Sequence, residues 1–342
     1  MRIAVCAPQV PFARGGTEIL VESLVRELRA RGHDADLVTI PFKWYPRARV
    51  LTQALLWRLT DLTEADGRPV ELVIATKFPS YAIRHPNKVV WLVHQFRQAY
   101  DLDGTALGQF GPDPFDRATR RAVHRLDRVA LGEARKLFAI SQNVADRLEA
   151  ASDLEAEVLR PPPQELDFRC EEYGGFVLSV GRLDRAKRVE LLVEAVASNP
   201  ALEAVVAGDG PDRPRLEALA GELGLDDRLR FVGRVDDAEL ARLYATCLAV
   251  FYAPVDEDLG LVPYEAFLSE KPVVTTSDAG GPLEVVADEE TGLVCEPEPA
   301  AVAAAVARLA ANRAEARTWG RRGKVVADAS SWDAVIDRLL ST

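Results

Sequence analysis

Apolar and polar positions alternate along the chain in a pattern that predicts buried strands separated by amphipathic helices. Arg2–Ala7 is a short apolar run that ends before Pro8, which is typical of a buried strand. In residues 17–31 the apolar side chains recur every three or four positions, as on one face of a helix, and Gly32 supplies a stop signal. Further strands are expected at Ala35–Ile40, Leu72–Thr76, Val89–His94 and Lys136–Ile140.

The alternation resumes after the segment Arg160–Gln164, whose three consecutive prolines favour an extended connection. The strands expected beyond it are Phe176–Val180, Ala204–Ala207, Leu229–Phe231, Ala249–Tyr252, Pro272–Thr275 and Gly292–Cys295. The helices expected are Val189–Ser198, Pro214–Leu223, Asp236–Ala245, Val262–Leu268, Pro282–Ala287, Pro299–Asn312 and Ser331–Leu340.

Strands that alternate with helices indicate an α/β fold in which helices cover both faces of parallel sheets. A length of 342 residues is sufficient for two such domains. We therefore predict two doubly wound, Rossmann-like domains, residues 1–163 and 164–325, followed by a C-terminal helix in residues 326–342 that packs back on the first domain. The ligand site is expected in an interdomain cleft, at the carboxyl ends of the strands.

Composition and charge narrow the classes of partner. The chain is 48% apolar and 28% charged, an ordinary globular balance, and its longest apolar runs fall short of the roughly 18–20 residues that cross a bilayer. Residues 1–170 carry a net charge of +2 and residues 171–342 one of −13, so an anion bound by the second half needs local cations. A pI of about 5.1 disfavours a nucleic-acid partner.

The cysteines and the N-terminus predict a cytoplasmic protein. Cys6, Cys170, Cys247 and Cys295 are far apart and form no C-x-x-C pair, which favours reduced thiols over a disulfide framework or a zinc site. The apolar stretch that follows Met1 is too short for a signal peptide.

The most informative stretch runs from Glu257 to Glu265. It follows a predicted strand, and the first N–H groups of the helix after it, near Gly260, Leu261 and Val262, suit an anion because they lack intrahelical partners. An ionised carboxylate accepts hydrogen bonds from two neighbouring hydroxyl groups, so the two glutamates suit a sugar and a ribose. The alternative is that Glu257 is solvated and Glu265 is a surface residue of the helix.

A second informative stretch, Gly181–Arg188, also joins a strand to a helix. Arg182 and Lys187 are the local cations that a diphosphate requires in an acidic half. As negative charge grows on a departing phosphate, fixed cations stabilise the transition state more than the ground state. The alternative is a basic, solvated loop, and this alternative weighs more for Arg185 and Arg188 than for Arg182 and Lys187.

Two signals in the first half are weaker. Gly15 and Gly16 join the first strand to the first helix and permit close approach of a ligand to the backbone. The alternative is that Thr17 simply caps the helix there. His94 ends an apolar strand at the expected cleft, where it would hydrogen-bond a sugar hydroxyl or a phosphate. A partly buried, structural histidine is the alternative.

Together these stretches resemble the retaining glycosyltransferases of family 4 (glycosyltransferase group 1), which have the GT-B fold. The resemblance extends over nearly the whole chain. Gly15-Gly16 is similar to the family's glycine loop and His94 to its cleft histidine. The other similar stretches, in the family's order, are Gly181-Arg182…Lys187, Gly208–Pro211, Phe231–Arg234 and the E-x7-E pair Glu257…Glu265.

The resemblance implies roles for these residues. Residues 1–163 would form the acceptor side and residues 164–325 the nucleotide-sugar-binding side. The implied catalytic residues are His94, Arg182, Lys187 and Glu257. The implied donor-binding residues are Gly15, Gly16, Arg182, Lys187, Gly210, Arg234, Val235, Glu257, Gly260, Leu261, Val262 and Glu265.

The implied reaction moves a hexose-type sugar from a UDP or GDP sugar to a hydroxyl of a cell-envelope, polysaccharide or lipid-linked acceptor. Retention in such enzymes is ascribed to front-face attack, with the leaving phosphate drawing the acceptor's proton. The resemblance implies no metal and no cofactor, and the D-x-D triplets at 34–36, 101–103 and 256–258 are expected by chance in an acidic chain. Asp258-Leu259 departs from the family's usual Gly-Phe, which leaves the donor sugar open.

Three other functions remain open. A nucleotide-sugar epimerase or hydrolase on the same fold would need acid/base groups beside the sugar, and the histidines offer no obvious pair. A dinucleotide oxidoreductase is disfavoured because neither half has G-x-G-x-x-G after its first strand. A non-catalytic nucleotide-sugar binding module would use the same cations without turnover.

The segment 43–58 contains cations and aromatic residues together, including Lys43, Trp44, Tyr45, Trp57 and Arg58. It is suited to a weak contact with anionic lipid at the inner face of the membrane. The alternative is a basic amphipathic helix that covers the core of the first domain.

Overall fold

The computed structural model describes residues 1–12, 15–105, 107–164 and 166–341. The chain divides into two compact units, the first formed by Met1–Pro161 with Ser331–Thr342 and the second by Pro162–Ser330. The division thus falls within the proline segment, between Pro161 and Pro162, two residues before the boundary that the sequence predicts at 163/164. Each unit is built around a six-stranded sheet whose strands are all parallel, so the predicted α/β, doubly wound architecture is confirmed.

The first unit contains a sheet in the order β2-β1-β5-β6-β7-β8. The chain passes from β1 to β2 on one side and then returns to β5 on the other side of β1. Its elements are β1 (Arg2–Gln9), α1 (Gly16–Ala30), β2 (Asp34–Pro41), α2 (Arg49–Leu59), β3 (Glu64–Ala65), β4 (Arg68–Pro69), β5 (Leu72–Lys77), η1 (Ser80–Ala82), β6 (Lys88–His94), η2 (Arg97–Ala99), α3 (Pro114–Gly132), β7 (Lys136–Ala139), α4 (Gln142–Ser152), β8 (Glu157–Val158) and α11 (Trp332–Leu340).

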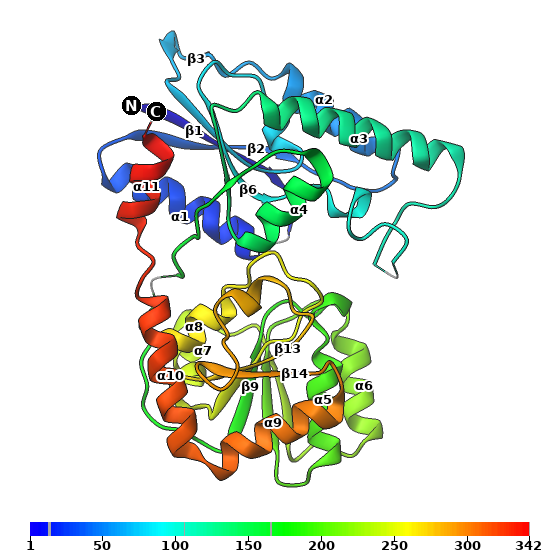
Figure 1. Cartoon of the computed structure of the whole chain (residues 1–342), viewed down its shortest axis with the longest axis vertical. Coiled ribbons are helices and arrows are strands. Elements are labelled where there is room, and N and C mark those ends of the chain that lie inside the picture. The colour runs from blue at the N-terminus through cyan, green and yellow to red at the C-terminus, as the bar shows by residue number, and fades with distance from the viewer. Residues whose placement is uncertain (13–14, 106, 165, 342) are drawn as a thin grey trace. The chain divides into compact units, whose positions relative to one another are not determined.

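The second unit contains a sheet in the order β11-β10-β9-β12-β13-β14. Figure 1 shows α7, α8 and α10 on one side of this sheet and α5 and α6 on the other. Its elements are β9 (Phe176–Val180), η3 (Arg185–Lys187), α5 (Val189–Ser198), β10 (Glu203–Ala207), α6 (Arg213–Glu222), β11 (Leu229–Gly233), α7 (Asp237–Thr246), β12 (Ala249–Phe251), α8 (Val262–Leu268), β13 (Val273–Thr276), η4 (Gly281–Glu284), β14 (Gly292–Cys295), α9 (Pro299–Ala311) and α10 (Arg313–Ala327).

The C-terminal helix belongs to the first unit. Ser331 caps α11 by accepting a hydrogen bond from the backbone of Ala334, which limits the start of the helix to Trp332. The Trp332 ring lies edge-on to Trp91 of β6, with ring centroids 6.2 Å apart, and both rings are buried. Burial of these two large aromatic rings packs the helix against its sheet.

The prediction of a helix at Pro282–Ala287 is wrong. The chain forms only the short 3-10 turn η4 and then leaves helical geometry at Val285. The Thr291 hydroxyl accepts a hydrogen bond from the backbone N–H of Ala287 at 2.9 Å and donates to the carbonyl of Val285 at 3.0 Å. These side-chain bonds satisfy the backbone groups that a longer helix would have paired internally.

Candidate active site

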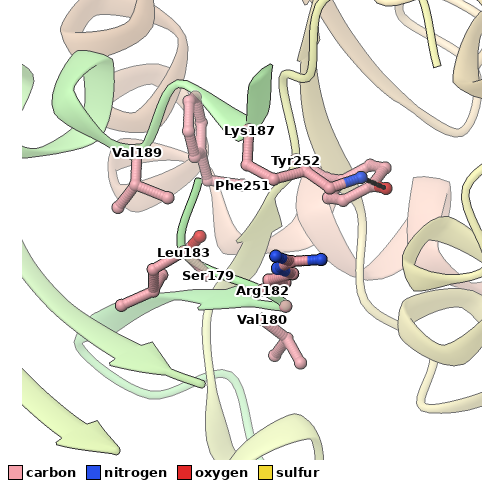
Figure 2. A pocket seen from close by; sticks show the side chains of 9 residues that line it. Ser179, Val180, Arg182, Leu183, Lys187, Val189, Phe251 and Tyr252 are labelled. Carbon is pink, nitrogen blue, oxygen red and sulfur yellow. Dashed lines mark hydrogen bonds between the residues drawn. The ribbon is translucent and has the colours of Figure 1, made fainter. Parts of the chain in front are cut away.

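The second unit has a small pocket at the point where the order of its strands reverses. The chain leaves β9 toward β10 on one side and later returns to β12 on the other, so the carboxyl ends of β9 and β12 lie at a topological switch point, the usual ligand site of such sheets. The pocket lies there and includes Gly181, Arg182, Lys187 and Tyr252 in its lining (Figure 2). Its volume is about 10 Å³, which is room for about one water molecule.

Arg182 and Lys187 both line this pocket. The Arg182 side chain is 59% exposed and lies 3.9 Å from the Asp184 carboxylate. Asp184 caps the 3-10 turn η3 by accepting from the backbone of Ala186, and this turn presents Lys187. The loop therefore places one exposed guanidinium and one largely buried ammonium at the end of β9.

Lys187 is paired with Glu257 and is not free. Its Nζ donates to the Glu257 carboxylate and, at 3.2 Å, to the Tyr252 hydroxyl. Burial by itself lowers the pKa of the Lys187 ammonium, but Tyr252 and Glu257 outweigh burial and hold this pKa above its ordinary value. Lys187 therefore stays protonated, and the carboxylate of Glu257, the predicted sugar-binding residue, neutralises its charge.

Glu265 is buried, which overturns the alternative of a surface helix residue. Its side chain is 5% exposed. Tyr244 donates its hydroxyl to Glu265 at 2.7 Å, and Gln164 donates from Nε2 at 3.4 Å. Burial raises the pKa of Glu265, and these two hydrogen bonds lower it in part. A buried carboxylate with such partners is a fixed acceptor.

The loop between Glu257 and α8 is shaped by close packing. Gly260 has φ = 79°, and a Cβ there would lie 2.7 Å from the ring of Tyr252, so the left-handed backbone and the adjacent ring both require glycine. The Glu257 backbone bonds to Ala279 and Gly281, at 2.8 Å each. Leu261 is the residue before α8, and Val262 is its first residue.

Gly210 lies directly against the loop that contains Arg182. A Cβ at Gly210 would lie 2.1 Å from the carbonyl oxygen of Leu183, so glycine is needed for this contact. Arg234 and Val235 directly follow β11, at the edge of the sheet, and Arg234 is exposed. Neither residue lines the pocket at β9 and β12.

The remaining predicted residues belong to the first unit. Gly15 precedes α1, and its N–H donates to the Glu18 carboxylate at 2.9 Å, while Gly16 is the first residue of that helix. Arg14, which precedes them, lies outside the described residues. His94 is the last residue of β6, and its Nδ1 donates to the carbonyl of Gln95 at 2.6 Å, so a neutral ring has its acceptor nitrogen at Nε2.

Sequence reasoning missed two tyrosines that contact the predicted residues. Tyr252 follows β12 and contacts Lys187, and Tyr244 lies on α7 and contacts Glu265. Both lie within apolar segments, where tyrosine is usually part of the core. The sequence signal that could have identified them is the hydroxyl group, because a buried tyrosine hydroxyl needs a hydrogen-bond partner.

Two further properties concern the described residues alone. None of the described helices combines the length and apolar character that a bilayer span demands. Within the described ranges, no three histidine, cysteine, aspartate or glutamate side chains gather as a metal site would require.

Similar proteins identify the class. Residues 169–326 match the family model described as Glycosyl transferases group 1. An uncharacterised glycosyltransferase of Methanocaldococcus jannaschii is 22% identical, over 95% of this chain and 93% of that protein. The mouse alpha-1,3/1,6-mannosyltransferase ALG2 is 30% identical, over 52% of this chain and 47% of that protein.

Solved structures share the whole fold. Sucrose-phosphate synthase from Thermosynechococcus elongatus superimposes with a TM-score of 0.78 at 22% identity, covering 99% of this chain and 97% of that one. Anabaena HepE, solved with UDP-glucose, gives a TM-score of 0.71 at 18% identity, covering 99% and 98%. Two doubly wound units, each built on a parallel six-stranded sheet, therefore have the GT-B fold.

The chain belongs to the group 1 glycosyltransferases, family 4, a relationship carried by its C-terminal unit. It is an enzyme that transfers a sugar from a nucleotide sugar.

Proposed function

We propose that the enzyme is a retaining hexosyltransferase that uses a UDP or GDP hexose and glycosylates a hydroxyl of a cell-envelope, polysaccharide or lipid-linked acceptor. Support for the hexose comes from a relative named as a mannosyltransferase and from a structural neighbour solved with UDP-glucose. The residues 162–330 would hold the donor, and the first unit would face the acceptor.

The observation that carries this proposal is the pair of cations at the carboxyl ends of β9 and β12. Arg182 and Lys187 line one pocket at the switch point, in the unit that matches the family. When the sugar leaves, negative charge develops on the distal phosphate of the nucleotide. A guanidinium fork and an ammonium fixed beside that phosphate lower the barrier, since they interact more strongly with the departing dianion than with the intact donor.

The ion pair between Lys187 and Glu257 neutralises the charge of both side chains. A diphosphate that approaches Lys187 competes with Glu257 for the ammonium, which frees carboxylate oxygens to accept hydrogen bonds from the sugar. Donor binding thereby exchanges one charge-assisted contact for two, one at the phosphate and one at the sugar. This exchange couples recognition of the sugar to recognition of the leaving group.

The other predicted residues complete the donor site in this proposal. Glu265 accepts from the ribose hydroxyls, and the N–H groups of Gly260, Leu261 and Val262 face the distal phosphate. Gly210 permits the close packing behind Arg182, and the backbone at Arg234 and Val235 faces the base. Gly15 and Gly16 also bind the donor, and His94 hydrogen-bonds a sugar hydroxyl or a phosphate.

A weak peripheral membrane contact is part of the proposal. Helix α2 buries Val50, Ala54 and Trp57, which fits the alternative of a core-covering helix, but it also exposes leucines on its outer face, including Leu59 at 73%. Two basic residues beside this face are engaged within the unit, since Arg47 pairs with Asp116 and Arg58 with Glu133. The remaining attraction is mainly apolar. Flotation with anionic vesicles tests the contact, and equal flotation of a Leu55→Ser/Leu59→Ser variant would contradict it. The leucines that α2 exposes on its outer face are Leu55, Leu56 and Leu59.

The donor is tested first by binding. A thermal-shift panel of UDP, GDP and their hexoses should show stabilisation by one nucleotide series, since a ligand stabilises the state that binds it. Incubation of the selected nucleotide sugar without acceptor then separates the transferase from an epimerase or hydrolase. Rapid and complete conversion of the donor would reject transfer as the main reaction.

The cations are tested by turnover. With a glycan and lipid extract as acceptor, Arg182→Ala and Lys187→Ala should each lower kcat by about 10²-fold or more, as loss of leaving-group stabilisation should. Arg185→Ala is the matched control, because Arg185 is an exposed cation of the same loop that pairs with Asp212. A chelator should leave turnover unchanged. Unaltered kcat in both cation variants would contradict their role at the leaving group, whereas turnover that never exceeds background would support a non-catalytic binding module.

A further inference from the structure

Arg188 lies between η3 and α5, directly after Lys187, in a backbone conformation that is uncommon for its residue type. Its φ is 48° and its ψ is 41°, which is the left-handed region where a side chain crowds the neighbouring backbone. Its side chain is 14% exposed, so the alternative of a solvated loop is wrong for this residue. Because the conformation is unfavourable by itself, the surrounding contacts must maintain it.

The guanidinium of Arg188 makes five hydrogen bonds at the carboxyl ends of two neighbouring strands. Beside β12, Nε donates to the carbonyl of Ala253 and Nη2 to that of Pro254, at 2.9 Å each. Beside β13, Nη1 and Nη2 donate to the Asp278 carboxylate at 2.7 and 2.6 Å, and Nη2 also donates to the Thr276 hydroxyl at 2.8 Å. Since Arg188 itself follows β9, one side chain joins the ends of three adjacent strands, β9, β12 and β13.

The number and direction of these bonds require an arginine. Two of the five form a charge-assisted fork with Asp278, and they lower the pKa of the Asp278 carboxyl below its ordinary value because they stabilise its ionised form. The guanidinium is a planar group with N–H donors on three nitrogens, whereas the ammonium of a lysine has three donors on one atom. A lysine at position 188 therefore cannot reach the same set of acceptors.

Lys187 is fixed to the end of β12 by bonds on both sides of Arg188's contacts. Its Nζ donates to the Tyr252 hydroxyl at 3.2 Å, as Figure 2 shows, and the carbonyl of the residue after Tyr252 binds Arg188. In the backbone, the N–H of Val255 donates to the carbonyl of Ala186 at 2.8 Å. The position of the Lys187 ammonium thus depends on how closely η3 and the loop after β12 are held together.

Glu257 is connected to the same guanidinium through the end of β13. The backbone N–H of Asp256 donates to the carbonyl of Asp278 at 2.9 Å, and Asp278 is the residue whose carboxylate pairs with Arg188. The loop that contains Glu257 and the turn that contains Lys187 are therefore attached to one side chain. The ion pair between Lys187 and Glu257 forms between these two attachments.

We propose that Arg188 is a positioning residue of the donor site, which holds Lys187 and Glu257 at the separation that a diphosphate sugar requires. Its guanidinium is bonded to acceptors within the protein, so it acts on the donor through the two loops that it joins. The inference rests on the proposed function, because the roles of Lys187 and Glu257 beside the leaving group are part of that proposal.

Binding calorimetry on the full chain tests this role with two probes, the nucleoside diphosphate that the thermal-shift panel selects and the matching monophosphate. The distal phosphate is the group beside Lys187 in the proposed function, so the ratio of the two affinities reports where the ammonium lies. Arg188→Gly removes the guanidinium and keeps a residue that adopts the left-handed region easily. We expect it to weaken diphosphate binding about tenfold and to change monophosphate binding less than about twofold.

Three further variants separate positioning from a purely structural role. In a Lys187→Ala background, Arg188→Gly should change the ratio less than about twofold further, because no ammonium is left to position. Asp278→Asn keeps Arg188 and removes the charge of its partner, so it should shift the ratio in the same direction by about threefold, and it tests the role even if Arg188→Gly does not fold. Arg185→Ala is the matched control, since Arg185 is an exposed cation of the same turn that pairs with Asp212, and it should leave the ratio unchanged.

Failure of this inference is separable from failure of the proposed function. If Lys187→Ala lowers the ratio but Arg188→Gly and Asp278→Asn do not, even with a lower Tm, Arg188 is purely structural and the inference is refuted. Full additivity of Arg188→Gly with Lys187→Ala would also refute it, because Arg188 would then act independently of the ammonium. If Lys187→Ala itself leaves the ratio unchanged, or if neither nucleotide series binds the wild-type protein, the proposed donor site fails and the inference fails with it.

Discussion

Replacing Asp127 by asparagine should remove a pH dependence from the stability of the first unit. Asp127 lies on α3, fully buried, and its Oδ2 accepts from Tyr100 at 2.8 Å and from Gln95 at 3.5 Å. Burial raises the pKa of its carboxyl from 3.8 to about 7, against the lowering effect of these hydrogen bonds. Asparagine keeps the shape and an acceptor oxygen but cannot ionise.

The magnitude follows from the two pKa values. Below pH ~4 the carboxyl is protonated in both the native and the unfolded chain, and its contribution to stability is fully present. As the pH rises, the unfolded chain releases the proton while the native chain retains it, and the native state loses about 1.4 kcal/mol per pH unit. The loss reaches about 4 kcal/mol near pH 7, the native pKa, and stays constant above it.

The assay is urea unfolding of the full chain, wild type and Asp127→Asn, at pH 5, 6, 7 and 8. The free energy of unfolding of the variant relative to wild type should rise by about 2 kcal/mol between pH 5 and 7 and then level off. Tyr100→Phe is an informative companion, because removal of the hydroxyl raises the native pKa of Asp127 further and extends the sloping region to higher pH. A difference between variant and wild type that is flat from pH 5 to 8 would refute the reasoning.

Three other substitutions test the packing and the donor site. Gly210→Ala places a Cβ 2.1 Å from the Leu183 carbonyl oxygen, so thermal unfolding should occur several degrees lower and nucleotide affinity should fall; unchanged affinity would mean that the contact does not shape the site. Trp332→Ala removes the ring that packs on Trp91 and should cost about 3–5 kcal/mol in urea unfolding, whereas a cost under 1 kcal/mol would show α11 to be loosely attached. Glu265→Gln should weaken nucleoside diphosphate binding about tenfold in calorimetry and leave pyrophosphate binding unchanged, and equal loss for both would remove the ribose role.

Apolar periodicity predicted most strands and many helices, because those elements bury faces made of apolar side chains. Strand β9, helix α5 and helix α8 begin and end at the predicted residues. Helix α3 was not predicted, because its buried face includes the polar residues Asp116 and Asp127, which interrupt the apolar pattern. Partners outside the helix, among them Arg47 for Asp116 and Tyr100 for Asp127, make those positions favourable inside the fold.

Helix α10 was missed for a different reason. Its buried face contains small residues, including Gly320 and Gly323, which sequence rules assign to turns. In the fold a Cβ at Gly323 would lie 2.2 Å from the Phe267 ring, and one at Gly320 would lie 1.8 Å from the Glu270 carbonyl oxygen. The glycines therefore permit α10 to lie close to α8, and this is a property of the pair of helices that neither sequence segment shows alone.

The sequence by itself determined the α/β class, the number of parallel sheets and the two loops that contain Arg182 and Glu257. These features are predictable because strand–turn–helix units are local, and their glycine, proline and capping signals follow one another along the chain. Tertiary structure alone decided that Lys187 pairs with Glu257 across 70 residues, that Glu265 is buried against Tyr244, and that Arg188 pairs with Asp278. Such pairings depend on which strand ends lie next to each other in a sheet, and chain topology sets this order independently of the local pattern of residues.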